Sequence, residues 1–173
     1  HRLAQWITNA PTLEEDIALA NISLDLLGQA RGLYPHVGEL DGSGASEDDF
    51  AMFRGAQGFR NVWLVELERG DFAQEMLRLL IFSSWRLSIA EATTASTDAQ
   101  LAAVMAKGVK EVRYHLEHAH SWVVRLGDGT DESHRRMVAA TAVLWPYLDE
   151  LFVDDPAAIA AAAVGVGPLP STL

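Results

Sequence analysis

Residues 12–40 read TLEEDIALANISLDLLGQARGLYPHVGEL, and this stretch predicts one long helix around which the rest of the chain is organised. Thr12 and Glu15 predict a capping box, in which the threonine hydroxyl accepts from an early backbone N–H and the glutamate reaches back. Apolar residues recur at helical spacing and form one stripe: Leu19, Ile22, Leu26, Ala30, Leu33 and Val37. Others lie outside that stripe, namely Ile17, Ala20, Leu24 and Leu27. We therefore expect this helix to be buried on more than one side.

A narrow line of polar or small residues interrupts this apolar surface. Its members are Glu14, Asn21, Asp25, Gly28 and Gly32. A buried charge without a partner costs several kcal/mol, so these groups need partners. The line is expected to face a polar site, a closely packed neighbouring backbone or another chain.

The remainder of the chain predicts further helices and no strands. We expect helices over residues 71–94, 98–126 and 130–152, the last kinked at Pro146, and a short helix starting at 154–156. Ser46 and Asp49 resemble another helix start. Residues 2–7 resemble the end of a helix, and because the sequence starts at His1 without a methionine, we expect that helix to begin outside it. The pattern predicts an all-α bundle of long antiparallel helices and short loops, with residues 1–173 forming a single domain truncated at its N-terminal helix.

Composition excludes several classes of function. The 173 residues carry a formal net charge of −11 and no cysteine. The acidic balance argues against binding to nucleic acid or to an anionic membrane, because both require a basic face. No apolar run approaches the roughly 18 residues needed to span a bilayer. Without cysteine, disulfides and thiolate metal sites are also excluded.

Polar residues inside a helical bundle can hold a pair of metal ions. Such a site takes a Glu from each of two helices and a Glu-x-x-His motif from each of the other two. Glu117 and His120 form the literal match to this motif, and Asp131 with His134 forms a weaker one at a helix start. A complete ligand set is absent, and charges on a solvated helix face explain such pairs equally well.

Glu111, His115 and Asp25 are the other candidate polar residues of a bundle interior. Glu111 and His115 lie one turn apart and could both face inward. His115 also fits a hydrogen-bonded core histidine, and Asp25 fits a helix-to-helix hydrogen bond as well as a catalytic role. No serine lies in a setting typical of a catalytic nucleophile.

Four stretches in the same order resemble the PaaC-type family of phenylacetyl-CoA epoxidase subunits. They are residues 19–31 (LANISLDLLGQAR), 59–66 (FRNVWLVE), 110–116 (KEVRYHL) and 125–133 (RLGDGTDES). Together they extend over nearly all of the chain and are specific, although any one alone would not be.

The resemblance implies a ferritin-like bundle in a cytoplasmic bacterial monooxygenase complex of phenylacetate catabolism. In that complex the di-iron site lies in a related ferritin-like catalytic subunit. Electrons come from an NADPH-dependent reductase, and the ring of phenylacetyl-CoA is epoxidised. The subunit that this chain resembles is structural and has lost the metal ligands, so no cofactor is expected in this chain. We expect Asp25, Glu111, Arg113 and His115 to form a polar network in the region of the lost site.

The resemblance also implies two segments near the bound CoA thioester. The first is Gly58, Phe59, Arg60 and Asn61, where Arg60 suits a phosphate and Phe59 could pack on adenine or pantetheine. The second is Ile159, Ala160 and Ala161. A plain interface role remains open for each of these residues.

Two alternatives remain. In one, the chain is itself a catalytic di-iron oxygenase or ferroxidase whose missing ligands lie on a helix outside the sequence. In the other, it is a helical interaction protein unrelated to CoA substrates.

Overall fold

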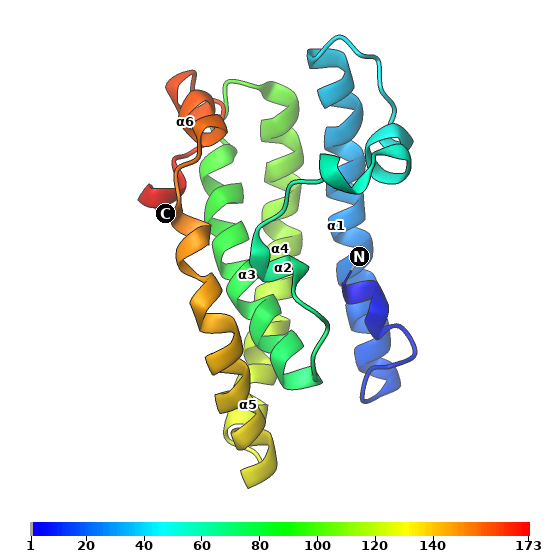
Figure 1. Ribbon diagram of the computed structural model, residues 1–173, viewed down its shortest axis with the longest axis vertical. Coiled ribbons are helices and arrows are strands. Elements are labelled where there is room, and N and C mark those ends of the chain that lie inside the picture. Colours follow the sequence, from blue (N-terminus) through cyan, green and yellow to red (C-terminus); the bar gives the residue numbers. More distant parts are fainter. Residues whose placement is uncertain (1) are drawn as a thin grey trace.

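The computed structural model describes residues 2–173, and over this range the chain forms helices and no strands (Figure 1). His1, at which the expected preceding helix would join, lies outside the described residues. The long helices are α1 (Leu13–Leu40), α3 (Phe72–Thr93), α4 (Ala99–Gly127) and α5 (Asp131–Leu144). The short α-helices are α2 (Trp63–Glu66) and α6 (Pro156–Ala163). The prediction of an all-α bundle of the ferritin-like kind is confirmed.

The starts of the long helices follow their capping residues. The side chain of Asp71 accepts from the Gln74 N–H at 3.0 Å, and that of Asp98 accepts from the Leu101 N–H at 3.0 Å. Thr12 accepts from the Glu15 N–H at 3.4 Å, as the capping box predicts. The second half of that box is wrong, because the Glu15 side chain turns to His118 on α4 instead.

Three segments are shorter or tighter than the sequence predicts. The expected helix over 130–152 ends at Leu144 and continues as 3₁₀ turns over Trp145–Tyr147 and Asp149–Phe152. The helix ends just before Pro146 instead of continuing past it with a kink. Proline lacks the N–H that an α-helical turn would use there, and the 3₁₀ turns that follow bring Leu151 into the cluster with Leu64 and Leu144. After Ser46 the chain forms only a π-helical turn, η2 (Asp49–Phe53), and a 3₁₀ turn, η3 (Ala56–Gly58). The first described residues likewise contain a 3₁₀ turn, η1 (Leu3–Trp6).

Helix α4 is the element on which the others converge. It packs along α3, contacts α5, and lies beside α1 on its other side (Figure 1). One buried cluster joins η1, α1, α3 and α4 through residues including Trp6, Ile22, Met76 and Ala119. A second cluster joins α2, the end of α5 and η5 (Asp149–Phe152) through Leu64, Leu144 and Leu151. No helix among residues 2–173 is both long and apolar enough to cross a membrane.

The two sides of α1 differ in burial. Leu19 and Ile22 on the predicted stripe are fully buried, whereas Leu24 is 62 % exposed and Ile17 and Leu27 are also more than half exposed. The expectation of burial on more than one side is therefore wrong within this chain. Among the described residues α1 contacts chiefly α4 and η1, and Leu19 and Ile22 pack in the cluster that joins these elements.

Candidate functional site

A row of polar pairs joins α1 to α4, and we call this row the α1–α4 seam. His115 Nε2 lies 3.0 Å from Asp25 Oδ2, and His115 is only 1 % exposed. Asp25 thus lies at hydrogen-bond distance from a residue of the neighbouring helix, as one of its two interpretations requires. The seam begins where His36 Nε2 lies 2.7 Å from Asp98 Oδ2.

Glu111 lies on the same seam and is also paired. Its Oε2 accepts from Gln29 Nε2 at 3.0 Å, and its Oε1 lies 3.3 Å from Lys107 Nζ. Gln29 in turn accepts from Arg86 Nη2 of α3 at 3.3 Å, and burial lowers the pKa of Arg86. A β-carbon at Gly108 would lie 3.2 Å from Gln29 Cδ, so glycine there lets the amide approach α4 closely.

Sequence reasoning missed the pair of His36 and Asp98, and it missed a further pair of the seam. His118 Nε2 lies 3.1 Å from Glu15 Oε2, and both side chains are nearly buried. The two atoms are close, but they are not aligned for a hydrogen bond. A signal was available, because His115 and His118 are spaced by three residues and share one helix face. This His-x-x-His spacing falls outside the Glu-x-x-His pattern of a di-iron site.

Other candidate residues lie away from the seam. Arg113, expected in the polar network, points to the surface, where its Nη2 lies 2.6 Å from Glu91 Oε1. Glu117 and His120 are both exposed, and His134 Nδ1 bonds the Gly127 carbonyl at 2.8 Å. Within residues 2–173 no three histidine, aspartate or glutamate side chains come together in a group that could hold a metal ion.

The segment Gly58–Asn61 crosses from the side of α1 to α3, in front of the bundle as Figure 1 shows it. Phe59 is half-buried and the other three residues are exposed. Arg60 Nη1 donates to the Gln57 carbonyl at 3.2 Å, so the side chain folds back on its own loop. Asn61 Nδ2 donates to Glu66 Oε1 at 3.2 Å.

The second predicted segment, Ile159–Ala161, lies on α6, which begins at a side-chain cap from Asp155. Ile159 and Ala160 are exposed. Within the part of the chain that the structure describes, no hydrogen bond or ion pair joins this segment to Gly58–Asn61. The connection between the two regions is indirect, because the Trp63 N–H donates to Glu150 Oε2 at 2.7 Å and Glu150 belongs to η5, which precedes α6.

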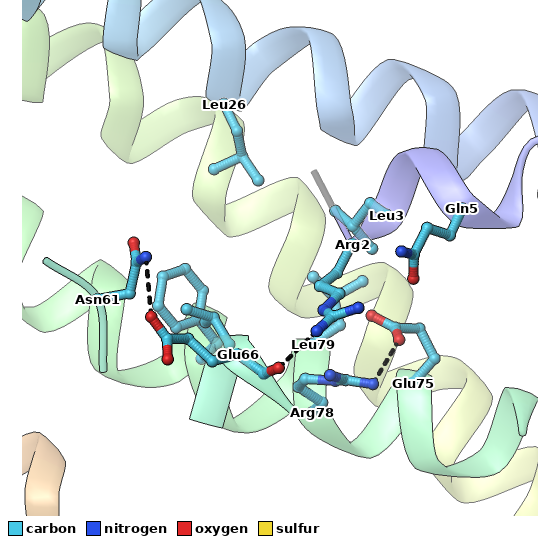
Figure 2. A pocket seen from close by; sticks show the side chains of 11 residues that line it. Arg2, Leu3, Gln5, Leu26, Asn61, Glu66, Glu75, Arg78 and Leu79 are labelled. Carbon is cyan, nitrogen blue, oxygen red and sulfur yellow. Dashed lines mark hydrogen bonds and ion pairs between the residues drawn. The ribbon is translucent and has the colours of Figure 1, made fainter. Parts of the chain in front are cut away.

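A cavity of about 620 Å³ lies between η1, α1, α2 and α3 (Figure 2). Asn61 is the one residue of the predicted segments that lines it, beside Glu66. Arg2 Nη2 bonds the Glu66 carbonyl at 2.6 Å. The apolar part of the lining is Leu3, Leu26, Val65, Leu79 and Phe82.

The polar wall of this cavity is a buried ion pair on α3. Arg78 Nη2 lies 2.9 Å from Glu75 Oε2 (Figure 2). The same guanidinium donates to the backbone carbonyls of residues 67, 68 and 69. Burial raises the pKa of Glu75 and lowers the pKa of Arg78. The pair fixes residues 67–69 to the start of α3. The polar side of the cavity is therefore held in place by contacts within the chain.

Similarity to known proteins extends along the whole chain. The family model described as phenylacetic acid catabolic protein matches residues 1–173. The chain is also 44 % identical, over 172 residues, to the C subunit of 1,2-phenylacetyl-CoA epoxidase from Escherichia coli (strain K12). This match covers 99 % of the chain and 69 % of the relative, so it includes the α1–α4 seam and both predicted ligand segments.

Proposed function

Because the chain belongs to the phenylacetic acid catabolic protein family, we propose that it is the non-catalytic, structural subunit of a phenylacetyl-CoA epoxidase. The observation that carries the proposal is the similarity to the C subunit of such an epoxidase over almost the whole chain. In this role the chain pairs with a related catalytic subunit that holds the di-iron site. An NADPH-dependent reductase supplies the electrons, and the complex works in the cytoplasm in phenylacetate catabolism.

The α1–α4 seam supports a structural role. Carboxylates and imidazoles that hold iron must face the metal, whereas Asp25, Glu111 and His115 each have a partner on the neighbouring helix. A buried polar network is stabilising when its members are satisfied. The ligand-type side chains of this bundle therefore serve to hold α1 against α4.

The outer side of α1 supports pairing with another helical subunit. Its exposed apolar residues follow one another at helical spacing along the helix: Leu13, Ile17, Leu24 and Leu27. A β-carbon at Gly28, on the same side, would meet no atom within 4 Å, so another helix has room to approach there. Contiguous exposed apolar surface is typical of protein–protein contacts.

Both predicted ligand segments are accessible to a CoA thioester. Arg60 has no carboxylate within 4.0 Å among the described residues, which leaves its charge available to a phosphate of phenylacetyl-CoA. Ile159 and the two following alanines offer an apolar surface on α6. We propose that these segments complete the CoA site of the assembled complex.

The test is iron content per chain, measured by elemental analysis on the protein expressed alone in iron-rich medium. Negligible iron is expected, and co-expression with the catalytic subunit serves as the positive control. Roughly two irons per chain, as a dinuclear site holds, would overturn the proposal and favour a di-iron oxygenase or ferroxidase.

Glu111→Ala tests the seam in the same preparation. The substitution leaves the nearly buried Gln29 amide without its acceptor, so the free energy of unfolding should fall by about 1–3 kcal/mol while iron content stays unchanged. Glu117→Ala, at an exposed position on the same helix, is the control and should change stability by less than about 0.5 kcal/mol. Equal stability of the two variants would contradict the role given to Glu111.

A helical interaction protein unrelated to CoA remains the competing interpretation. It predicts no stable recovery with a second ferritin-like chain, and no effect of Arg60→Ala on the Michaelis constant of a complex for phenylacetyl-CoA. Stable co-purification together with a raised Michaelis constant would exclude it.

A further inference from the structure

We propose that Arg54 is the positioning residue of the ligand segment Gly58–Asn61, holding Phe59 and the Gly58 carbonyl in place before a CoA thioester binds. This inference rests on the proposed function, since it concerns the same segment. Arg54 lies outside the residues that the sequence singled out, and the structure alone brings it to the segment.

Arg54 contacts both sides of the loop that leads to Asn61. Its Cζ atom lies 4.7 Å from the centre of the Phe59 ring and 5.5 Å from that of Phe50. Its Nε donates to the Phe50 carbonyl at 2.9 Å, and its Nη1 donates to the Gly58 carbonyl at 3.3 Å. A guanidinium over an aromatic face is attracted by the ring, most strongly where water is excluded. The loop therefore closes around one side chain.

This cluster is fixed to α1 as well. The rings of Tyr34 and Phe50 stack with centroids 5.5 Å apart and an interplanar angle of 23°. Arg54 Cζ lies 5.8 Å from the Tyr34 ring centre. Arg54 thus transmits the position of a long helix to an otherwise irregular loop.

Arg54 occupies the space that a side chain at residue 58 would need. A β-carbon at residue 58 would lie 2.7 Å from Arg54 Cγ and 2.8 Å from its Cδ. These atoms are in the middle of the arginine side chain, so relieving the clash would move the guanidinium away from Phe59. The two residues are therefore coupled, and substituting either one should disturb the same arrangement.

The position of Arg60 depends on the loop that Arg54 holds. Its Nη1 donates to the carbonyls of Gln57 and Phe59, which flank Gly58. Neither Arg54 nor Arg60 has a carboxylate within 4.0 Å among residues 2–173, although the chain carries a net charge of −11. Arg54 orders the loop, and the exposed Arg60 is left to meet an anion.

An ordered loop improves binding because the cost of ordering it does not have to be met when the ligand arrives. The effect of Arg54 should therefore appear in substrate binding and leave the chemical step unchanged. In kinetic terms, the Michaelis constant changes and the turnover number does not.

The experiment measures kcat and KM for phenylacetyl-CoA with the assembled epoxidase complex carrying variants of this chain. Arg54→Ala and Gly58→Ala should each raise KM about tenfold at unchanged kcat, as expected for losing cation–π contacts and a charged hydrogen bond. Arg54→Lys, which keeps the charge but loses the planar fork, should fall between Arg54→Ala and the unaltered protein. Arg125→Ala is the matched control, because Arg125 lies over Trp122 at 5.4 Å on α4, and it should leave KM unchanged.

The double variant Arg54→Ala with Gly58→Ala distinguishes positioning from general damage. Once Arg54 is shortened the clash at residue 58 disappears, so the double variant should raise KM no further than either single variant. A multiplicative loss in the double variant would overturn the coupling. Should Arg54→Ala fail to assemble, Arg54→Lys and Gly58→Ala carry the same comparison.

Arg60→Ala separates failure of this inference from failure of the proposed function. If Arg60→Ala raises KM and Arg54→Ala does not, the positioning role is overturned while the ligand segment stands. If neither changes KM, the segment does not bind the CoA thioester, and both the site and the inference are overturned.

Discussion

Helices α1 and α3 are both rich in apolar residues on more than one side, yet they end up in different surroundings. Helix α3 contacts both α4 and α5, and Glu75 and Arg78 within it are 2 % and 3 % exposed. Helix α1 meets α4 along one side through the polar seam, and Leu24 on its other side remains exposed. The apolar pattern of a helix therefore does not by itself reveal which of its sides the same chain covers.

The charged residues of the two helices also differ in where their partners lie. The buried pair of α3 lies within one helix and fixes the chain that precedes it, whereas the polar groups of α1 are matched by residues of α4 far away in the sequence. Removing a charge from α3 should therefore damage the fold itself. Substitutions on the buried side of α1 should change the stability of this chain, and substitutions on its exposed side should change association with the partner.

The largest expected effect is that of Arg78→Ala. It leaves Glu75 buried without its cation and removes the donor of three backbone carbonyls, so the free energy of unfolding should fall by about 3–5 kcal/mol. Urea denaturation of the purified chain measures this loss. Arg113→Ala, which breaks the exposed pair with Glu91, is the control and should cost less than about 1 kcal/mol. Equal losses in the two variants would show that burial does not distinguish these pairs.

A pair of substitutions on α1 compares its two sides directly. Ile22→Ala opens a cavity in the core and should lower the free energy of unfolding by about 2–5 kcal/mol. Leu24→Ala, two residues away and exposed, should change it by less than about 0.5 kcal/mol.

Leu24→Asp then tests whether the exposed side of α1 contacts the catalytic subunit. It should leave the folding of this chain intact and weaken its association with the catalytic subunit, as measured by sedimentation or calorimetric titration. Unchanged association would show that the partner does not cover this side of α1.

The smallest expected effect concerns Asp98, which caps α4 and contacts His36 of α1. The Leu101 N–H, followed by the bond to His36, holds the pKa of Asp98 below its ordinary value of 3.8. Its stabilisation is therefore present above that pH and is lost as the pH falls through the lowered pKa. Asp98→Ala should lower Tm by a few degrees at neutral pH, and the difference from the unaltered protein should close in acid.

Asp98→Asn keeps a capping side chain without the charge, so its Tm should lie between the other two at neutral pH. A loss in Asp98→Ala that is the same at neutral pH and in strong acid would contradict a charge-dependent role.

The accuracy of the sequence predictions depended on the distance between the interacting residues. The starts of α1, α3 and α4 were predicted because a capping side chain bonds an N–H three residues away. The end of α5 was placed too late, although Pro146 marked the position. Whether the chain continues as a helix or as 3₁₀ turns after a proline depends on packing, here that of Leu151 in the second turn with Leu64 and Leu144.

The candidate polar residues show the same limit. Asp25, Glu111 and His115 were singled out from the sequence, and the structure places them on the α1–α4 seam, but their partners were not all foreseen, and Arg113 lies on the surface instead. Gln29 and Arg86 gave no signal, because long polar side chains occur on any solvated helix. His118 gave a signal in its spacing from His115, and Glu15 gave none beyond its place in a capping box.

The sequence by itself determined that this protein is a helical bundle, where most of its helices begin, and which family it resembles. Those features depend on local hydrogen bonds, helical periodicity and short motifs, all contained within a few neighbouring residues. Only the tertiary structure decided the pairing along the α1–α4 seam, the exposed side of α1 and the place of Arg54 over Phe59. Asp25 and His115 are 90 residues apart, and such a contact exists only after the helices have packed.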